Sequence, residues 1–145
     1  KNISWERISD EFMKILASDN AADSVELLRS SGLLLQIMPE LTRAVGVEQK
    51  SPGRHHTDDV WTHLIKALEH CPSPDPIVRF AALIHDIGKP ETRDITEDGV
   101  TTFYNHEIVG ANIAHRIGER FRLSKKVLSI SFTSNGKFLV NNNQK

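Results

Sequence analysis

Three separate stretches of the chain each carry a histidine of the kind that binds metals or moves protons. They are His63, His106 and the pair formed by His85 and Asp86, and all seven histidines of the chain lie within residues 55–115. Imidazole nitrogens combined with a carboxylate, without thiolates, suit Mn, Fe, Co, Ni or Zn, and Mg where oxygen ligands dominate. The residue types therefore predict a divalent metal site, with chance clustering as the alternative.

The spacing of these residues indicates which elements would have to hold them. His85 follows His63 by 22 residues and His106 follows Asp86 by 20, so each interval has room for one helix–loop–helix unit. Helices that pack as antiparallel neighbours place inward-facing groups at one point, as in the metal sites of helical bundles. Apolar residues at helical spacing predict three such helices, over residues 58–70, 75–87 and 105–121.

The His85-Asp86 pair lies at the end of a predicted helix that is apolar nearly all round and is therefore expected to be buried. Burying two ionisable groups without a partner is costly, so a metal ion or a polar network is expected beside them. Asp75 followed by Pro76 predicts where this helix begins, as an N-cap and then a proline at the first helical position. Lys89 follows the pair and suits either a phosphate contact or a favourable charge at the helix end.

Composition bounds the class of protein. The chain has 145 residues, 39% hydrophobic and 26% charged, which is typical of one globular domain and excludes disorder of the whole chain. The net charge of −1 gives no overall attraction to nucleic acid, and no apolar run approaches the roughly 18 residues of a membrane span. Cys71 is the single cysteine, which excludes an intrachain disulfide framework and a Cys-rich zinc site. We therefore expect a cytoplasmic protein without a membrane partner.

The rest of the sequence predicts an all-α fold with one exception near its end. Residues 1–41 have the pattern of short helices, whereas residues 42–57 and 88–104 lack apolar periodicity and are predicted loops. Residues of alternating polarity flank Asn135-Gly136, which is the signal of a short hairpin with a type I′ turn. The predicted fold is thus a helical bundle preceded by a small helical neck and followed by a short hairpin.

The run AALIHDIGK over residues 81–89 resembles the signature of the HD superfamily of metal-dependent phosphohydrolases. Further motifs resemble the C-terminal half of bacterial tRNA nucleotidyltransferases of the CCA-adding and poly(A) polymerase family. The resemblance extends over roughly residues 4–127. Its motifs are ERI at residues 6–8, GLLLQIMPEL at 32–41, DVWTHL at 59–64 and FYNHE at 103–107.

The resemblance implies a division of the chain. Residues 1–41 would form the RNA-binding neck, residues 42–57 a linker loop, residues 58–127 the HD domain and residues 128–145 an atypical tail. In that family a nucleotidyltransferase head, with a Gly-Ser loop and paired aspartates, precedes the neck, so this chain resembles one part of a longer protein. In some members the HD domain hydrolyses 2′,3′-cyclic phosphates, 2′-nucleotides or other phosphate esters.

The same resemblance implies which residues would carry the chemistry. His63, His85 and Asp86 match the positions that hold a divalent metal ion, and His106 is implied as a further ligand or a phosphate contact. His85, Asp86 and Lys89 are implied as the catalytic set. The residue types leave the choice of ion open among Mg, Mn, Ni, Co, Fe and Zn.

The substrate implied for this site is a phosphate ester or nucleotide, with tRNA as a partner of the whole protein. Lys89 and Arg93 are implied contacts for the phosphate, and His56 is a further candidate for substrate binding. One feature departs from the family's pattern. HD enzymes usually complete the metal site with a later aspartate, whereas no Asp, Glu or His follows Lys126. The sequence thus predicts a metal site that lacks this downstream carboxylate.

The sequence is also compatible with two other functions. The first is a non-catalytic module that binds tRNA through the neck and a degenerate HD site. The second is a stand-alone HD protein acting on nucleotides, which the neck motifs within residues 6–41 disfavour. A run of basic residues supports the tRNA-binding module, although such a run is also typical of a helix face exposed to solvent. Its members are Arg116, Arg120, Arg122, Lys125 and Lys126.

We predict that this chain alone transfers no nucleotide. Nucleotidyl transfer needs carboxylates that hold magnesium opposite a triphosphate, and Asp86 is the only carboxylate in the predicted site. The purified chain should therefore not incorporate labelled CTP or ATP into tRNA, with a full-length tRNA nucleotidyltransferase as positive control. Incorporation above a no-protein control would show that this prediction is wrong.

Overall fold

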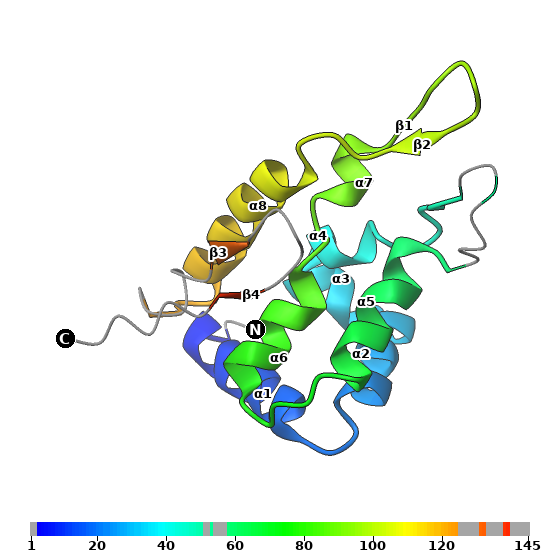
Figure 1. Cartoon of the computed structure of the whole chain (residues 1–145). Coiled ribbons are helices and arrows are strands. Elements are labelled where there is room, and N and C mark those ends of the chain that lie inside the picture. Colours follow the sequence, from blue (N-terminus) through cyan, green and yellow to red (C-terminus); the bar gives the residue numbers. More distant parts are fainter. Residues whose placement is uncertain (1–2, 51–52, 54–57, 125–130, 133–137, 140–145) are drawn as a thin grey trace.

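The computed structural model describes residues 3–50, 53, 58–124, 131–132 and 138–139. It confirms the predicted all-α class, with two antiparallel pairs of two-residue strands as the exception within these residues (Figure 1). None of the described helices is both long and apolar enough to cross a membrane. The helices are α1 (Trp5–Ala17), α2 (Ala21–Ser30), α3 (Leu33–Ile37), α4 (Pro39–Thr42), α5 (Val60–Glu69), α6 (Pro76–Ile84), α7 (Lys89–Thr92) and α8 (His106–Arg120). The strands are β1 (Asp94–Ile95), β2 (Thr101–Thr102), β3 (Ser131–Phe132) and β4 (Phe138–Leu139).

The N-terminal helices begin and end at residues whose chemistry explains the boundaries. α1 begins after Ser4, whose Oγ accepts a hydrogen bond from the Arg7 N–H at 3.3 Å. α2 begins after Asn20, although the Asn20 side chain makes no capping hydrogen bond. Gly32 separates α2 from α3 with φ at 84°, a left-handed conformation that glycine adopts without the steric cost met by other residues.

Aspartate caps start the helix that carries His63 and the helix that leads into the His-Asp pair. α5 begins after Asp59, whose Oδ1 accepts from the Thr62 N–H at 2.8 Å, slightly later than the predicted start at residue 58. Asp75 Oδ1 accepts from the Ile77 N–H at 2.9 Å, which confirms the predicted Asp-Pro start of α6. α6 ends at Ile84 and is shorter than predicted, so the His-Asp pair lies in the turn that follows the helix.

The predicted loop over residues 88–104 has more regular structure than expected. It contains the short helix α7 and the hairpin of β1 and β2, in which Asp94 pairs with Thr102 and Ile95 with Thr101. Strands of two residues are too short to show alternation in a sequence, so periodicity does not reveal them.

A hairpin is present near the C-terminus, as predicted. β3 pairs antiparallel with β4, with Ser131 opposite Leu139 and Phe132 opposite Phe138. The antiparallel pairing confirms the predicted hairpin, but its register differs from the predicted one, because a two-residue turn at Asn135-Gly136 would place Phe132 opposite Leu139. The Asn135-Gly136 turn expected between the strands lies outside the described residues.

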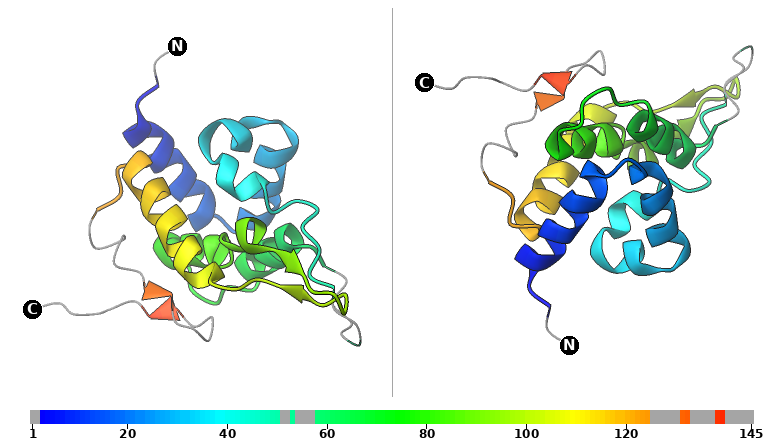
Figure 2. Two further views of the ribbon diagram at one scale, coloured as in Figure 1. Left: turned by 90° about the horizontal axis from the view of Figure 1, so that it is seen from above. Right: turned by 90° about the horizontal axis from the view of Figure 1, so that it is seen from below.

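Buried aromatic rings join the first helix to the rest of the core. The Phe12 ring of α1 meets Phe80 of α6 edge-on, with 6.2 Å between ring centroids, and meets Phe121 after α8 edge-on at 5.7 Å. All three rings belong to one hydrophobic cluster, and Figure 2 shows α1 beside α8. Residues of the predicted neck and of the predicted HD domain thus share a core, while the boundaries at 41 and 58 stay a prediction.

Arg79 ties the end of α1 to the start of α6. Its Nη1 donates to the carbonyl oxygens of Leu16 and Ser18, both at 2.7 Å, and its Nε donates to the Ser73 carbonyl at 2.9 Å. The last carbonyls of a helix lack partners within the helix. The guanidinium satisfies two carbonyls at the end of α1 while it holds the chain that leads into α6.

An ion pair makes a further contact between the two predicted regions. Glu40 of α4 is buried and contacts Arg120 at the end of α8 through both carboxylate oxygens, with 3.0 Å between Oε2 and Nη1. Arg120 Nη1 also donates to the Ile37 carbonyl at 3.2 Å. Burial raises the pKa of Glu40, but the hydrogen bonds and charge of Arg120 outweigh burial, so the pKa lies below its usual value.

We predict that Arg120→Met lowers the free energy of unfolding by about 3–5 kcal/mol, because it leaves the Glu40 carboxylate buried without its partner. Urea unfolding at neutral pH measures this loss. Arg116→Met on the same helix is the matched control, since Arg116 is exposed, and should change stability by no more than about 0.5 kcal/mol. An equally small effect of Arg120→Met would contradict the structural role of the ion pair.

The pH dependence is a second check of the same pair. Because the pKa of Glu40 is lowered in the folded protein, its ionisation stabilises the fold above its unfolded pKa, and this contribution is lost as the pH falls through the folded value. The difference in stability between wild type and Arg120→Met should therefore shrink as the pH falls from about 7 to below the ordinary glutamate value of 4.5. The Arg116→Met difference should stay small throughout.

Candidate metal centre

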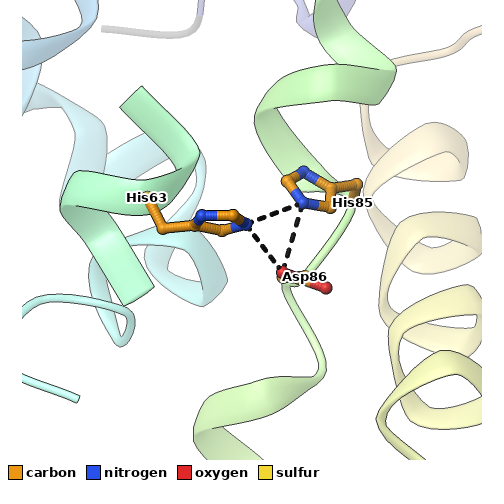
Figure 3. Close-up of side chains that lie close together, drawn as sticks. All are labelled: His63, His85 and Asp86. Atoms are coloured by element: carbon orange, nitrogen blue, oxygen red, sulfur yellow. Dashed lines mark hydrogen bonds and ion pairs between the residues drawn. The ribbon is translucent and has the colours of Figure 1, made fainter. Parts of the chain in front are cut away.

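Three side chains converge beside the C-terminal end of α6 (Figure 3). His63 Nε2 lies 3.0 Å from His85 Nε2 and 3.0 Å from Asp86 Oδ2, and His85 Nε2 lies 3.2 Å from the same oxygen. His63 reaches the cluster from α5, while His85 and Asp86 come from the turn after α6. The convergence predicted from the spacing of the helices is therefore present.

Hydrogen bonding fixes which nitrogen of His85 carries a proton. The Nδ1 atom lies 2.7 Å from the Ala82 carbonyl oxygen, and because a carbonyl oxygen only accepts, Nδ1 must be the donor. In the neutral imidazole, Nε2 then holds a lone pair. This lone pair faces the Asp86 carboxylate and His63 Nε2, and a bound cation would stabilise such a group of electron-rich atoms.

The donor set fits a divalent ion of the predicted kind. Bonds of about 2.0–2.2 Å to nitrogen and carboxylate oxygen place neighbouring ligand atoms about 3 Å apart when they lie at right angles around an ion. The observed separations of 3.0–3.2 Å agree with this requirement. In the described part of the chain, His63, His85 and Asp86 are the group whose ligand atoms all lie within 4.8 Å of one another. The cluster therefore supports metal binding and leaves the identity of the metal open.

Backbone hydrogen bonds hold the turn that carries the His-Asp pair. The Ile87 N–H donates to the Ile84 carbonyl at 3.0 Å, and the Lys89 N–H donates to the Asp86 carbonyl at 3.0 Å. Ile87 is 1% exposed, so a rotation of this turn would bring an apolar side chain out of the core. The Asp86 carboxylate is thereby held in a buried position.

Asp86 is charged in this environment although it is buried. Burial by itself raises the pKa of a carboxyl group, but hydrogen bonds from His63 and from the protonated form of His85, together with the charges of that imidazolium and of Lys89, outweigh burial. They lower the pKa of Asp86 far below its usual value. Burial lowers the pKa of His85, but the hydrogen bond and charge of Asp86 outweigh it, so the pKa is raised overall. Asp86 therefore supplies negative charge to the site at neutral pH.

Lys89 belongs to the same cluster through Asp86. Its Nζ lies 3.0 Å from Asp86 Oδ2, 2.8 Å from Gln49 Oε1 and 5.3 Å from the centroid of the Phe103 ring. Sequence reasoning identified Lys89 but missed both of its other neighbours as site residues. Phe103 was visible as part of the FYNHE motif, whereas Gln49 lies in a predicted loop where neither motif nor periodicity marks it.

His106 contacts the other oxygen of Asp86. Its Nε2 lies 3.5 Å from Asp86 Oδ1, and its Nδ1 lies 2.9 Å from the Phe103 carbonyl oxygen. The carbonyl places a proton on Nδ1, as at His85, so Nε2 of the neutral ring faces the carboxylate with a lone pair. His106 stands outside the three-residue group, and its part as a further ligand stays a prediction.

Arg93 and His56 are the other two predicted substrate contacts. Arg93 Nε donates to the Glu48 carbonyl at 3.1 Å, so Arg93 holds the backbone of the segment that contains Gln49. Its phosphate contact stays a prediction. His56 lies outside the described residues.

Gly88 allows α8 to approach the turn that holds the His-Asp pair. A Cβ atom at position 88 would lie 2.1 Å from the His106 carbonyl oxygen and 2.6 Å from the Gly110 nitrogen. Both are backbone atoms that cannot rotate away, so a larger residue would have to displace the helix. Gly88 has an ordinary φ of −79°, and close packing rather than backbone conformation explains why glycine stands here.

Comparison with known families agrees with this geometry. A family model of the HD domain matches residues 53–140. The chain belongs to the HD domain family. A second family model, described as a probable RNA and SrmB-binding site of polymerase A, matches residues 1–45. The two matches confirm the resemblance drawn from the motifs, and the HD match extends on both sides of the predicted range 58–127.

Relatives of this HD-domain chain include several tRNA nucleotidyltransferases. The A-adding tRNA nucleotidyltransferase of Deinococcus radiodurans is 38% identical over 125 residues, which cover 82% of this chain and 28% of that protein. The CC-adding tRNA nucleotidyltransferase of Thermus thermophilus is 38% identical over 128 residues, 85% of this chain and 29% of that protein. The Multifunctional CCA protein of Azoarcus sp. is 33% identical over 120 residues, 81% of this chain and 28% of that protein. The chain thus spans less than a third of the length of these curated relatives.

We predict that Gly88→Ala both destabilises the HD domain and weakens its metal site. The added methyl group forces α8 away from the turn, at a cost of about 1–3 kcal/mol for overpacking, and His106 moves with the helix. Urea unfolding measures the loss of stability. Calorimetric titration with Mn²⁺ or Co²⁺ measures the metal affinity, which should fall.

Gly110→Ala is the matched control for this change. A Cβ atom there would lie 3.4 Å from the Gly88 nitrogen and 3.7 Å from its Cα, which is ordinary contact, and alanine favours a helix over glycine by up to about 1 kcal/mol. We expect Gly110→Ala to keep both stability and metal affinity close to wild type. If the two variants behave alike, the close approach at position 88 does not constrain the site.

Proposed function

We propose that the chain is a metal-dependent phosphohydrolase domain of a protein that processes the 3′ ends of tRNA. The observation that carries the proposal is the convergence of His63 Nε2, His85 Nε2 and Asp86 Oδ2 within 3.2 Å of one another, beside the ammonium group of Lys89. Such a cluster combines a place for a divalent cation with a positive group for a phosphate ester or nucleotide. Membership of the HD family supports the same activity.

Each residue contributes a separate part of the chemistry in this proposal. His63 and His85 offer neutral nitrogen donors, and Asp86 supplies the negative charge. When bound, a divalent ion supplies Lewis-acid activation of water and of the phosphoryl group. The Ala82 carbonyl keeps a proton on His85 Nδ1 and so leaves Nε2 free of one in the neutral ring. Lys89 would stabilise the negative charge of a phosphate through a charge-assisted hydrogen bond.

We also propose that tRNA is the partner of the whole protein. Relatives are named for adding nucleotides to tRNA, and the family model over residues 1–45 is described as a probable RNA-binding site. Of the basic run predicted from the sequence, Arg116 and Arg122 are exposed and suit RNA contact. Arg120 pairs with Glu40 instead. The last two members of that run, at 125 and 126, lie outside the described residues.

A non-catalytic tRNA-binding module is the second candidate. The same match over residues 1–45 favours it, because RNA binding by the neck does not require chemistry in the HD domain. The two candidates differ in whether the purified chain holds a metal ion and hydrolyses a phosphate ester.

We predict that Asp86→Asn abolishes metal binding, whereas Lys89→Met does not. Asp86 is the anionic member of the group, and two neutral imidazoles alone do not compensate a divalent charge. Removing Lys89 takes a cation away from the site, so metal content should be kept or should rise. In Lys89→Met, hydrolysis of bis(p-nitrophenyl) phosphate should slow by about ten- to a hundredfold, since the lost charge-assisted contact contributes about 1.5–3 kcal/mol. Elemental analysis and a chromogenic assay with Mn²⁺, Co²⁺, Ni²⁺ and Mg²⁺ measure the two quantities.

Lys66→Met is the control for a lost lysine. Lys66 lies on α5 and pairs with Asp58, with more than half of its side chain exposed, so both readouts should equal those of wild type. A wild-type protein that binds no metal, hydrolyses nothing and still binds tRNA would refute the phosphohydrolase and favour the binding module.

A further inference from the structure

We propose that Gln49 is a positioning residue that holds the Lys89 ammonium group beside Asp86. Gln49 Oε1 accepts a hydrogen bond from Lys89 Nζ at 2.8 Å. The role of this contact in catalysis rests on the proposed phosphohydrolase function, while the contact itself can be tested without it. Gln49 acts through Lys89 in this proposal and is not itself a catalytic residue.

The surroundings of Lys89 explain why such a partner is needed. The Lys89 side chain is 16% exposed, and an ammonium group withdrawn from water needs protein partners for its three N–H bonds. Asp86 Oδ2 and Gln49 Oε1 are two oxygen acceptors, and the face of the Phe103 ring is a third, weaker partner. Gln49 and Phe103 therefore supply two contacts to the ammonium group in addition to its ion pair with Asp86.

Sharing the ammonium group matters because Asp86 Oδ2 already serves the metal cluster. His63 and His85 approach the same oxygen at 3.0 and 3.2 Å. Lys89 Nζ also contacts this oxygen, at 3.0 Å, and its positive charge opposes that of a divalent cation bound there. The hydrogen bond to Gln49 gives the ammonium group a second oxygen acceptor, so Nζ is held at the edge of the cluster, where it can contact a phosphate.

The backbone on both sides of Gln49 is anchored by later parts of the chain. Arg93 Nε donates to the Glu48 carbonyl at 3.1 Å, and Thr101 Oγ1 of β2 donates to the Lys50 carbonyl at 2.6 Å. The hairpin of β1 and β2 and the residue after α7 thus hold the segment that presents Gln49. This arrangement gives the hairpin of β1 and β2 a role in the site.

The direct test asks whether Lys89 stays ordered when the Gln49 acceptor is removed. Spectra that correlate ¹H and ¹⁵N in ¹⁵N-lysine-labelled protein show an ammonium signal where hydrogen bonds slow its exchange with water, and Lys89→Arg identifies that signal. We expect Gln49→Leu to lose the Lys89 signal and Gln49→Glu, which keeps an oxygen acceptor, to retain it. Gln36→Leu is the matched control, because Gln36 is exposed on α3, and it should keep the signal.

A kinetic test uses the whole chain with Mn²⁺ and bis(p-nitrophenyl) phosphate. In Gln49→Leu the KM should rise about tenfold with a smaller change in kcat, because Lys89 is no longer placed in advance for the phosphate. Gln49→Glu should restore the KM to within about twofold of wild type. Thermal unfolding of each variant distinguishes this effect from a loss of the fold.

Three results would overturn the inference. They are a wild-type spectrum without a Lys89 ammonium signal, a Gln49→Leu spectrum that keeps the signal, and an unchanged KM in a folded Gln49→Leu protein that has lost it. If the signal depends on Gln49 but the wild type hydrolyses nothing with any metal, the positioning contact is supported and the phosphohydrolase proposal fails.

Discussion

The buried carboxylate of Asp86 determines how most of the groups around it are arranged. A charge withdrawn from water is costly unless other charges and hydrogen bonds compensate it. His63, His85, Lys89 and His106 all reach this carboxylate within 3.5 Å. They come from α5, from the turn after α6, from the start of α7 and from the first turn of α8. The packing of these helices thus gathers three imidazole rings and one ammonium group around a single carboxylate, and a divalent cation bound there would compensate its charge further.

Convergence on this carboxylate was predictable because its histidine partners lie on helices with their own sequence patterns, or directly after one. Gln49 was not predictable, because its place depends on hydrogen bonds that Arg93 and Thr101 make to the backbone on either side of it, more than forty positions away. Those residues belong to or adjoin elements of two to four residues, which carry no periodicity. The predicted end of α6 at residue 87 is three residues later than the observed end at Ile84 for a related reason. The bond from Ile87 N–H to Ile84 O tightens the chain before Gly88, the residue that the sequence marks as a stop.

The two family matches describe regions that share one core. Phe12, from the match over residues 1–45, packs against Phe80 and Phe121, from the match over 53–140. Arg79 donates to carbonyls at the end of α1, and an ion pair joins α4 to α8. Aromatic, hydrogen-bonded and ionic contacts therefore all cross from one match to the other. A movement of the neck relative to the HD domain would have to break all three kinds of contact, so the structure favours a neck that stays fixed on the metal-site helices.

The backbone contact between Gly88 and α8 also bears on protein engineering. Residues 81–89 supply His85 and Asp86, but the Cα of Gly88 faces backbone atoms of a second helix with no room for a side chain between them. Moving this segment onto another helical scaffold would require a partner helix at the same close approach, with glycine or alanine at the crossing point that Gly110 occupies here. A site of this kind needs its supporting elements as much as its ligands. The unit that can be transplanted is a pair of helices with their spacing, and not the short motif alone.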